Sequence, residues 1–203
     1  MKISNQGKHT VSLFRSSRFV CEKIKKEIES GDIQGLFGDI SNIVITDITA
    51  GNGGDVITFS RYFKFVNAIE KCPYEFKHLK NNVISMERDN IKLFNADCTK
   101  IINFNKIPDI NDLQQDVVYI DPPWGGVNYK KYASLRLFIN DSPIEKIVYL
   151  ILNNNIAKLV AIKAPYNFAI ELFTSIIKKE VKNVVITIED IGKYYLVLCY
   201  VMK

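Results

Sequence analysis

Short apolar runs rich in β-branched residues alternate along the chain with longer segments of helical period, and this alternation limits the possible folds most strongly. The strand-like runs occupy residues 43–48, 65–69, 91–94, 117–120, 158–163, 183–189 and 194–201. Helices are expected between them at 54–62, 73–86, 143–153 and 167–179, with another at 19–29 before the first strand. Strands that alternate with helices form parallel β-α-β units with helices on both sheet faces. The pattern therefore predicts an α/β fold with a seven-stranded, mostly parallel sheet.

The last two apolar runs depart from this alternation. Only a few residues, including Gly192, separate them, which is too short for a crossover and predicts an antiparallel hairpin. A mostly parallel sheet with one antiparallel strand resembles the Rossmann-like fold of the class I methyltransferases.

Composition limits the class of protein further. The 203 residues are 47% hydrophobic and 24% charged, which is typical of one packed domain. The first residues lack the apolar core of a secretory signal. The run YYLVLCYVM has nine residues, about half of what a membrane-spanning helix needs. We expect an intracellular monomer, cytoplasmic or nuclear, with no membrane partner.

Cysteine spacing argues against a metal site. The four cysteines lie far apart and include no Cys-x-x-Cys pair: Cys21, Cys72, Cys98 and Cys199. The chain has two histidines. Neither a zinc site nor a disulfide framework is indicated, so we expect reduced, mostly buried thiols and no metal.

Basic charge is concentrated near the N-terminus. Residues 1–28 contain seven basic and two acidic residues, so they account for the whole net charge of +5. A solvated helix face is one explanation. Because Phe14 and Phe19 are interleaved with these charges, a segment that closes on a phosphorylated, planar ligand is another.

The first strand is followed by the glycine-rich stretch DITAGNGGDV. Its glycines allow a tight turn and a close approach of backbone to ligand. No Gly-Lys-Ser/Thr follows, so it is not a phosphate loop. Glu70 ends the second strand 23 residues beyond Asp47, close to the offset at which an acid accepts hydrogen bonds from a ribose, and Asp97 follows the third strand.

Together these positions predict a binding site for S-adenosylmethionine at the carboxyl ends of the strands. A nicotinamide dehydrogenase is the alternative, but the Asp-Pro-Pro-Trp that follows the fourth strand, within YIDPPWGG, has no role in it. The predicted cofactor residues are Asp47, Thr49, Ala50, Gly51, Gly53, Glu70, Asp97 and Asp121.

The two prolines of YIDPPWGG restrict the backbone, because each fixes its own φ and disfavours helix at the preceding residue. Such a stretch holds an aromatic ring and oxygen acceptors in place. Asp121 and the carbonyl of Pro122 can accept hydrogen bonds from an exocyclic amine, and Trp124 offers a stacking face. The predicted catalytic residues are Asp121, Pro122, Pro123 and Trp124.

The extended motif Pro-Pro-Trp-Gly-Gly-x-x-Tyr, from Pro122 to Tyr129, resembles the trimethylguanosine synthase family. A typical member reads Ser-Pro-Pro-Trp-Gly-Gly-Pro-x-Tyr, and the similarity spans residues 40–170, including KAPYNF. The family methylates the N2 amine of the 7-methylguanosine cap of RNA. This chain differs at three positions, with Asp121 for serine, Val127 for proline and Tyr166 for arginine.

The resemblance implies a set of cap-binding residues. Pro165 and Asn167 match the loop that holds the cap phosphates, Lys163 is a nearby cation, and LFRSSRF (residues 13–19) is similar to an N-terminal family segment. The implied cap-binding residues are Phe14, Arg15, Arg18, Trp124, Tyr129, Lys130, Lys163, Pro165 and Asn167.

The resemblance also implies an organisation and a function. Residues 1–30 would form a basic N-terminal arm or helix that binds the cap, and residues 31–203 the Rossmann-like methyltransferase domain. The partner would be 7-methylguanosine-capped RNA. Two alternatives stay open: an adenine-N6 methyltransferase on DNA or RNA, which also uses Asp-Pro-Pro-Trp, and a cap- or RNA-binding relative without catalysis.

Overall fold

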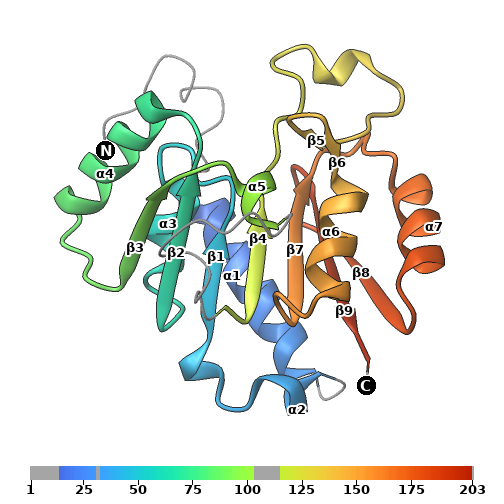
Figure 1. Ribbon diagram of the computed structural model, residues 1–203, viewed down its shortest axis with the longest axis horizontal. Helices are drawn as coiled ribbons and strands as arrows, with labels where there is room; N and C mark the ends of the chain where they lie inside the picture. The colour runs from blue at the N-terminus through green and yellow to red at the C-terminus, as the bar shows by residue number, and fades with distance from the viewer. Residues whose placement is uncertain (1–13, 31–32, 103–114, 203) are drawn as a thin grey trace. The chain divides into compact units, whose positions relative to one another are not determined.

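The computed structural model describes residues 14–30, 33–102 and 115–202 (Figure 1). Its elements in chain order are α1 (Phe14–Glu29), α2 (Gln34–Phe37), η2 (Ile40–Asn42), β1 (Val44–Asp47), α3 (Gly54–Phe59), β2 (Phe65–Glu70), α4 (Pro73–Ser85), β3 (Ile91–Asn95), α5 (Cys98–Ile102), β4 (Val117–Ile120), η3 (Tyr129–Lys131), β5 (Phe138–Ile139), β6 (Ser142–Pro143), α6 (Ile144–Asn153), β7 (Leu159–Ala164), α7 (Ile170–Glu180), β8 (Val184–Asp190) and β9 (Tyr195–Val201).

The seven predicted strands form one sheet in the order β3-β2-β1-β4-β7-β9-β8. The prediction of a mostly parallel seven-stranded sheet with one antiparallel strand is confirmed. The short elements α2, α5, β5 and β6 were not predicted, because two to five residues carry no measurable period. The chain divides into two compact units, Met1–Cys98 with Gln114–Tyr119, and Thr99–Leu113 with Ile120–Lys203.

In the first unit, β1 pairs in parallel with β2 and β4, and β2 pairs in parallel with β3. The register places Asp47 opposite Ala68 and Tyr119, and Glu70 opposite Asn95. Helix α3 packs on β1 and β2, and α4 on β2 and β3. The strand ends that carry the predicted cofactor residues therefore lie along one edge of this part of the sheet.

Helix α1 is packed within the first unit, against α3. It includes the predicted helix 19–29 and buries a stripe at helical spacing: Val20, Cys21, Ile24 and Ile28. The Ser17 hydroxyl donates to Asp55 Oδ1 over 2.5 Å, and the Tyr119 hydroxyl donates to Asp55 Oδ2 over 3.3 Å. The predicted arm is thus, over residues 14–29, a helix that shares the buried core. Residues 1–13 of that arm lie outside the described residues.

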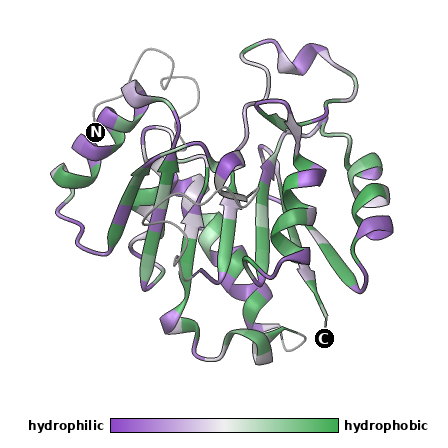
Figure 2. Ribbon diagram, in the orientation of Figure 1, coloured by the Kyte–Doolittle hydropathy of each residue, from purple (hydrophilic) through white to green (hydrophobic). Residues whose placement is uncertain are grey.

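In the second unit, β9 runs antiparallel to both β7 and β8, so the predicted hairpin is confirmed. Helix α6 packs on β7 and β9, and α7 on β8. Every residue of β7 is buried, and Figure 2 shows hydrophobic colour along most of this strand. A fully buried strand that still contains a lysine, Lys163, requires a partner for that charge.

Three of the four cysteines, Cys21, Cys98 and Cys199, are buried, and Cys72 is exposed. Burial raises the pKa of each of the three buried thiols, to about 12 for Cys98. In the described residues, no group of three or more His, Cys, Asp or Glu side chains is arranged to hold a metal ion. None of the described helices has the length and apolar character needed to cross a bilayer.

The turn between β1 and α3 generates a stability prediction. Gly53 has φ +89°, and a Cβ at this position would lie 2.6 Å from Cδ1 of the buried Leu79. We expect Gly53→Ala to lower the free energy of unfolding by about 2–4 kcal/mol, through left-handed strain and overpacking. Gly51→Ala is the matched control, since its φ is also positive (+51°) but its Cβ would meet only the Thr49 oxygen at 4.0 Å.

The control should cost less, about 1–2 kcal/mol, because only the backbone term remains. Urea unfolding followed by circular dichroism measures both variants. Equal losses would show that contact with Leu79 contributes nothing.

Candidate active site

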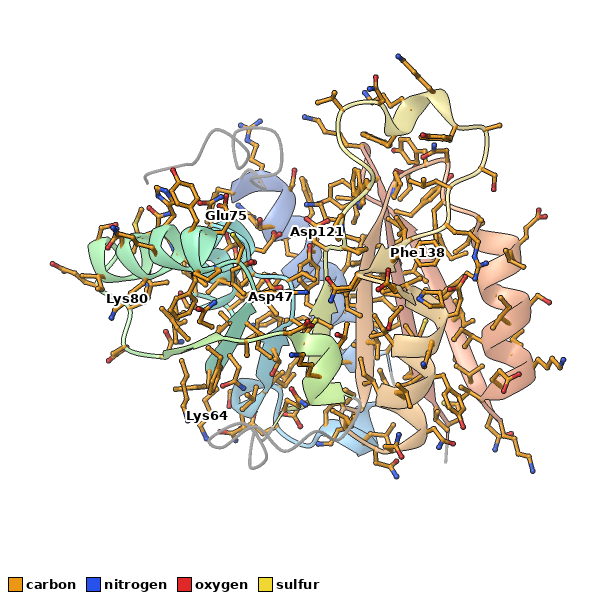
Figure 3. All side chains as sticks on the ribbon, turned by 45° about the horizontal axis from the view of Figure 1, so that its top comes forward. Asp47, Lys64, Glu75, Lys80, Asp121 and Phe138 are labelled. Carbon is orange, nitrogen blue, oxygen red and sulfur yellow. The ribbon has the colours of Figure 1, made fainter. Side chains whose placement is uncertain are left out.

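The first unit carries seven of the eight predicted cofactor residues, at and just after the ends of its strands, and the eighth, Asp121, belongs to the second unit. Asp47 is the last residue of β1 and is buried, and Figure 3 labels it at this position. Its Oδ1 accepts hydrogen bonds from the Thr49 backbone N–H (2.9 Å) and the Thr49 hydroxyl (3.3 Å). The Ala50 N–H donates to the Ile69 carbonyl over 3.0 Å. These bonds hold the glycine-rich turn against the end of β2.

Glu70 binds the same turn from β2. Its Oε2 accepts from the Gly51 N–H over 2.8 Å, and its Oε1 accepts from the Cys72 N–H over 2.7 Å. Burial raises the pKa of Glu70, and the two backbone N–H groups oppose this rise. The carboxylate thus joins two loops at the edge where the sequence places a ribose-binding acid.

Asp97 is the third predicted acid, and it forms an ion pair that the sequence analysis missed. Lys71 Nζ lies 3.0 Å from Asp97 Oδ2, with side-chain exposures of 58% and 13%. Asn95 Nδ2 also donates to the Glu70 carbonyl (2.8 Å) and the Lys71 carbonyl (3.2 Å). The ends of β2 and β3 are therefore linked by side chains as well as by the strand ladder. Each of the three acids, Asp47, Glu70 and Asp97, is held by contacts within the protein.

The second unit contains the DPPWGG part of the motif, which directly follows β4, and Figure 3 labels Asp121 there. Asp121 Oδ2 lies 2.7 Å from Lys163 Nζ, and the two side chains are 20% and 8% exposed. Pro122 is buried and Pro123 is exposed. The acid of the motif is therefore held by a cation from β7.

Aromatic rings gather around Trp124. Tyr129 meets it edge to face with ring centroids 5.2 Å apart and an interplanar angle of 71°, and Tyr194 lies 6.3 Å away, tilted by 59°. Lys163 Nζ lies 5.9 Å from the Trp124 centroid and 5.0 Å from the Tyr194 centroid. We call Asp121, Trp124, Tyr129, Lys163 and Tyr194 the Trp124 cluster.

The two glycines after Trp124 have a backbone conformation that other residues rarely adopt. Gly125 and Gly126 have φ of +84° and +77°, and a Cβ at either would meet no atom within 4 Å. The chain turns through left-handed backbone here, which glycine adopts without strain. Trp124 Nε1 is buried and has no hydrogen-bond partner among the described residues.

Asn167 holds the loop that follows this turn. Its Nδ2 donates to the backbone carbonyls of Tyr129 (2.9 Å) and Tyr132 (2.8 Å), and the backbone carbonyl of Asn167 accepts from the Leu135 N–H over 2.7 Å. Both amide hydrogens of Asn167 are thus used within the protein. Its assignment to cap phosphates stays a prediction, and the geometry shows a residue that positions Tyr129.

The other implied cap residues differ in their surroundings. Pro165 is buried, and its carbonyl accepts from the Phe168 N–H over 2.9 Å. Lys130 is exposed, with Nζ 5.9 Å from the Tyr129 centroid. Tyr166, where the family commonly has arginine, donates through its hydroxyl to Asp190 Oδ1 over 2.7 Å, and this bond contributes most to raising the pKa of Tyr166 to about 12.

The three N-terminal residues implied in cap binding lie on α1 in the first unit and are exposed. Arg18 Nε donates to Glu22 Oε1 over 2.7 Å, one helical turn away. The Arg61 guanidinium lies 5.2 Å from the Phe14 centroid. Arg15 is exposed beside them. Their role in cap binding stays a prediction.

Tyr194 is the aromatic member of the cluster that the sequence analysis did not identify. The register of β7 with β9 places Ala164 opposite Tyr195, so Tyr194 comes immediately before the paired end of β9. A hairpin was predicted there, but the pairing of β9 with β7 was not. The pairing of β9 with β7 places Tyr194 beside Lys163.

Comparison with known proteins shows the family to which the chain belongs. Residues 42–203 match the model of a family described as RNA cap guanine-N2 methyltransferase. The chain belongs to this family. The suspected resemblance is therefore confirmed at the level of the family.

Two proteins are similar in sequence to this chain. The uncharacterized protein L320 of Acanthamoeba polyphaga mimivirus is 34% identical over 163 residues, which are 80% of this chain and 60% of the relative. The uncharacterized RNA methyltransferase TTE1797 of Caldanaerobacter subterraneus subsp. tengcongensis is 28% identical over 142 residues, which are 70% of this chain and 28% of the relative. The matched part thus spans less than two thirds of either relative.

Solved structures show the same fold. The human methyltransferase 10 domain containing protein has a TM-score of 0.61 at 14% identity, covering 100% of this chain and 90% of that one. The N-terminal domain of human METTL16 has a TM-score of 0.59 at 14% identity, covering 89% of this chain and 69% of that one. The cap methyltransferase family member therefore has a Rossmann-like class I methyltransferase fold.

The raised pKa of Glu70 gives a prediction for stability against pH. Because folding raises this pKa, the folded state holds the proton more tightly than the unfolded chain. The resulting stabilisation is present at low pH and is lost as pH rises through the folded-state pKa. We expect the free energy of unfolding of the wild type, minus that of Glu70→Gln, to be larger near pH 5 than near pH 7.

Urea unfolding of both proteins across this range measures the difference. Glu180→Gln, which removes an exposed carboxylate at the end of α7, corrects for the loss of one negative charge. A difference that falls with decreasing pH would contradict the prediction.

Proposed function

We propose that this chain transfers methyl groups from S-adenosylmethionine to the exocyclic N2 amine of the 7-methylguanosine cap of RNA. The observation that carries the proposal is the Trp124 cluster, in which an acceptor carboxylate and a stacking ring follow β4 in a member of the cap guanine-N2 methyltransferase family. Family membership supports the reaction class, and the cluster supports an amine on a planar base as the acceptor.

The carboxylates of the first unit have the chemistry that the cofactor requires. S-adenosylmethionine supplies an activated methyl group on a cationic sulfur when bound. Glu70 would accept hydrogen bonds from its ribose, and Asp97 and Asp47 would offer acceptors to its amino groups. The anchored turn at Gly51 presents backbone to the same ligand.

The second unit supplies the groups that an exocyclic amine requires. The lone pair of such an amine is delocalised into the base, so the amine must be held in line with the methyl group for attack. Asp121 and the Pro122 carbonyl would accept its N–H groups, and Trp124 would stack on the base. Each proline limits how far these acceptors can move.

A 7-methylguanosine base carries a delocalised positive charge, which favours an aromatic face by about 0.5–2 kcal/mol beyond stacking. Lys163 lies over the Trp124 ring, but its charge is paired with Asp121. The pair adds little net repulsion against a cationic base. The exposed basic residues Lys130, Arg15 and Arg18 would provide counter-charge for the cap triphosphate.

One observation favours an alternative acceptor. Asp121 stands where the cap family commonly has serine, and Asp-Pro-Pro-Trp is also used by adenine-N6 methyltransferases. The second candidate is therefore methylation of adenine N6 in DNA or RNA, with Asp121 and Trp124 in the same roles.

A methyl-transfer assay decides between these functions. We expect 7-methylguanosine triphosphate to be methylated and to be preferred over guanosine triphosphate by about two- to thirtyfold, from the cation–π term. An adenine-containing oligonucleotide tests the alternative acceptor. Equal use of methylated and unmethylated guanosine would defeat the cap assignment, and transfer to adenine alone would establish the alternative.

Two substitutions should separate base binding from cofactor binding. Trp124→Ala removes stacking of about 1–3 kcal/mol and should chiefly raise KM for the base. Glu70→Ala removes a charge-assisted acceptor and should weaken cofactor affinity by about 1.5–3 kcal/mol. Isothermal calorimetry with cofactor and with base gives both affinities for each variant. A Trp124→Ala protein with full affinity for the base would rule out stacking on this ring.

A further inference from the structure

The strongest unexplained feature of the second unit is a buried cation beside the motif acid. Lys163 comes from β7, 42 residues after Asp121, and its Nζ lies 2.7 Å from Asp121 Oδ2. Only 8% of the Lys163 side chain is exposed. A surface ion pair contributes little, but a buried charge that loses its partner is strongly destabilising. Each of these two groups therefore restricts the other.

The ammonium group of Lys163 has further neighbours in the same cluster. It lies 5.0 Å from the Tyr194 centroid and 5.9 Å from the Trp124 centroid. Cation–π contacts of this kind stabilise a desolvated ammonium over an aromatic face. Because the carboxylate and the two rings surround it, the lysine has a defined place from which to hold Asp121 and Trp124 relative to each other.

We propose that Lys163 is a positioning residue that orients the Asp121 carboxylate toward the acceptor amine. This inference rests on the proposed function, in which Asp121 accepts a hydrogen bond from that amine. It differs from the implied role of Lys163 as a cation for cap phosphates. In the positioning role, Lys163 acts through Asp121, and it does so whether the acceptor is guanine or adenine.

A double-substitution cycle tests the proposal. Lys163→Met removes the ammonium that pairs with the Asp121 carboxylate, Asp121→Asn removes the charge of that carboxylate, and the double variant carries neither charge. We expect Lys163→Met to lower turnover at saturating substrates about tenfold or more, with cofactor affinity unchanged. Lys163→Arg, which keeps the charge, should retain more turnover than Lys163→Met.

The decisive comparison is between Asp121→Asn and the double variant. Once Asp121 is neutral, removal of the Lys163 ammonium should cause no further loss of turnover. The turnover of the double variant should therefore equal or exceed that of Asp121→Asn. If Asp121 and Lys163 acted independently, their effects on turnover would multiply. A further tenfold decrease in the turnover of the double variant, relative to Asp121→Asn, would therefore overturn the proposal. This comparison does not require that Lys163→Met folds. Lys146→Met, on an exposed position of α6, controls for the loss of one lysine and should match the wild type.

Unfolding measurements separate this inference from the proposed function. If the wild type methylates neither guanosine nor adenine, the proposed function fails. The Asp121–Lys163 pair is then assessed by urea unfolding of the wild type, the two single variants and the double variant. Coupling of about tenfold or more in the unfolding equilibrium constant is then expected between Asp121 and Lys163. Additive effects on unfolding, or full turnover in Lys163→Met, would show that Lys163 does not position Asp121.

Discussion

The parallel pairing of β1 with β2 and β4 is the constraint on which the first unit depends. Its register aligns Asp47 with Ala68 and Tyr119, so the acid of β1 and the end of β4 lie at the same level of the sheet. Because parallel strands end at one edge, the loops that follow β1 and β2 lie at the same edge of the first unit. Backbone N–H groups of those two loops then bind Glu70.

The strands and longer helices followed from the sequence because their signals are local. All seven strands lie within one residue of their predicted bounds, since β-branched runs bounded by polar turns leave little choice. Helix α1 begins at Phe14, before the predicted start at residue 19. The first turn of α1 contains the exposed residues Phe14 and Arg15. This turn therefore lacks the apolar period by which the remaining turns of the helix were predicted. In this part of α1, the Ser17 hydroxyl bonds Asp55, a residue 38 positions away that the local sequence pattern does not indicate.

The site was predicted residue by residue, but its pairings were not. Asp121, Trp124 and Lys163 were each identified, yet nothing local in the sequence indicates that Lys163 bonds Asp121 rather than a phosphate. The pairing arises because β7 is buried along its whole length, which forces its only charged residue to find a partner. Lys71 with Asp97 is similar, and Tyr194 required the register of β9 on β7. Contacts between strands distant in the chain are set by tertiary packing, which periodicity does not encode.

The Asp121–Lys163 pair also determines how charge can act in recognition. A carboxylate alone beside Trp124 would attract any cationic base through a long-range field, and salt would weaken that attraction. With Lys163 bound to it at 2.7 Å, the net charge of the pair is zero. In the proposed function, selection of a cationic base would therefore fall to the aromatic rings at short range. Salt acts little at that range but strongly on contacts between exposed basic residues and phosphates. If the protein binds a cap as proposed, base recognition and phosphate recognition would therefore be physically separable, because they would depend on interactions that salt screens to different extents.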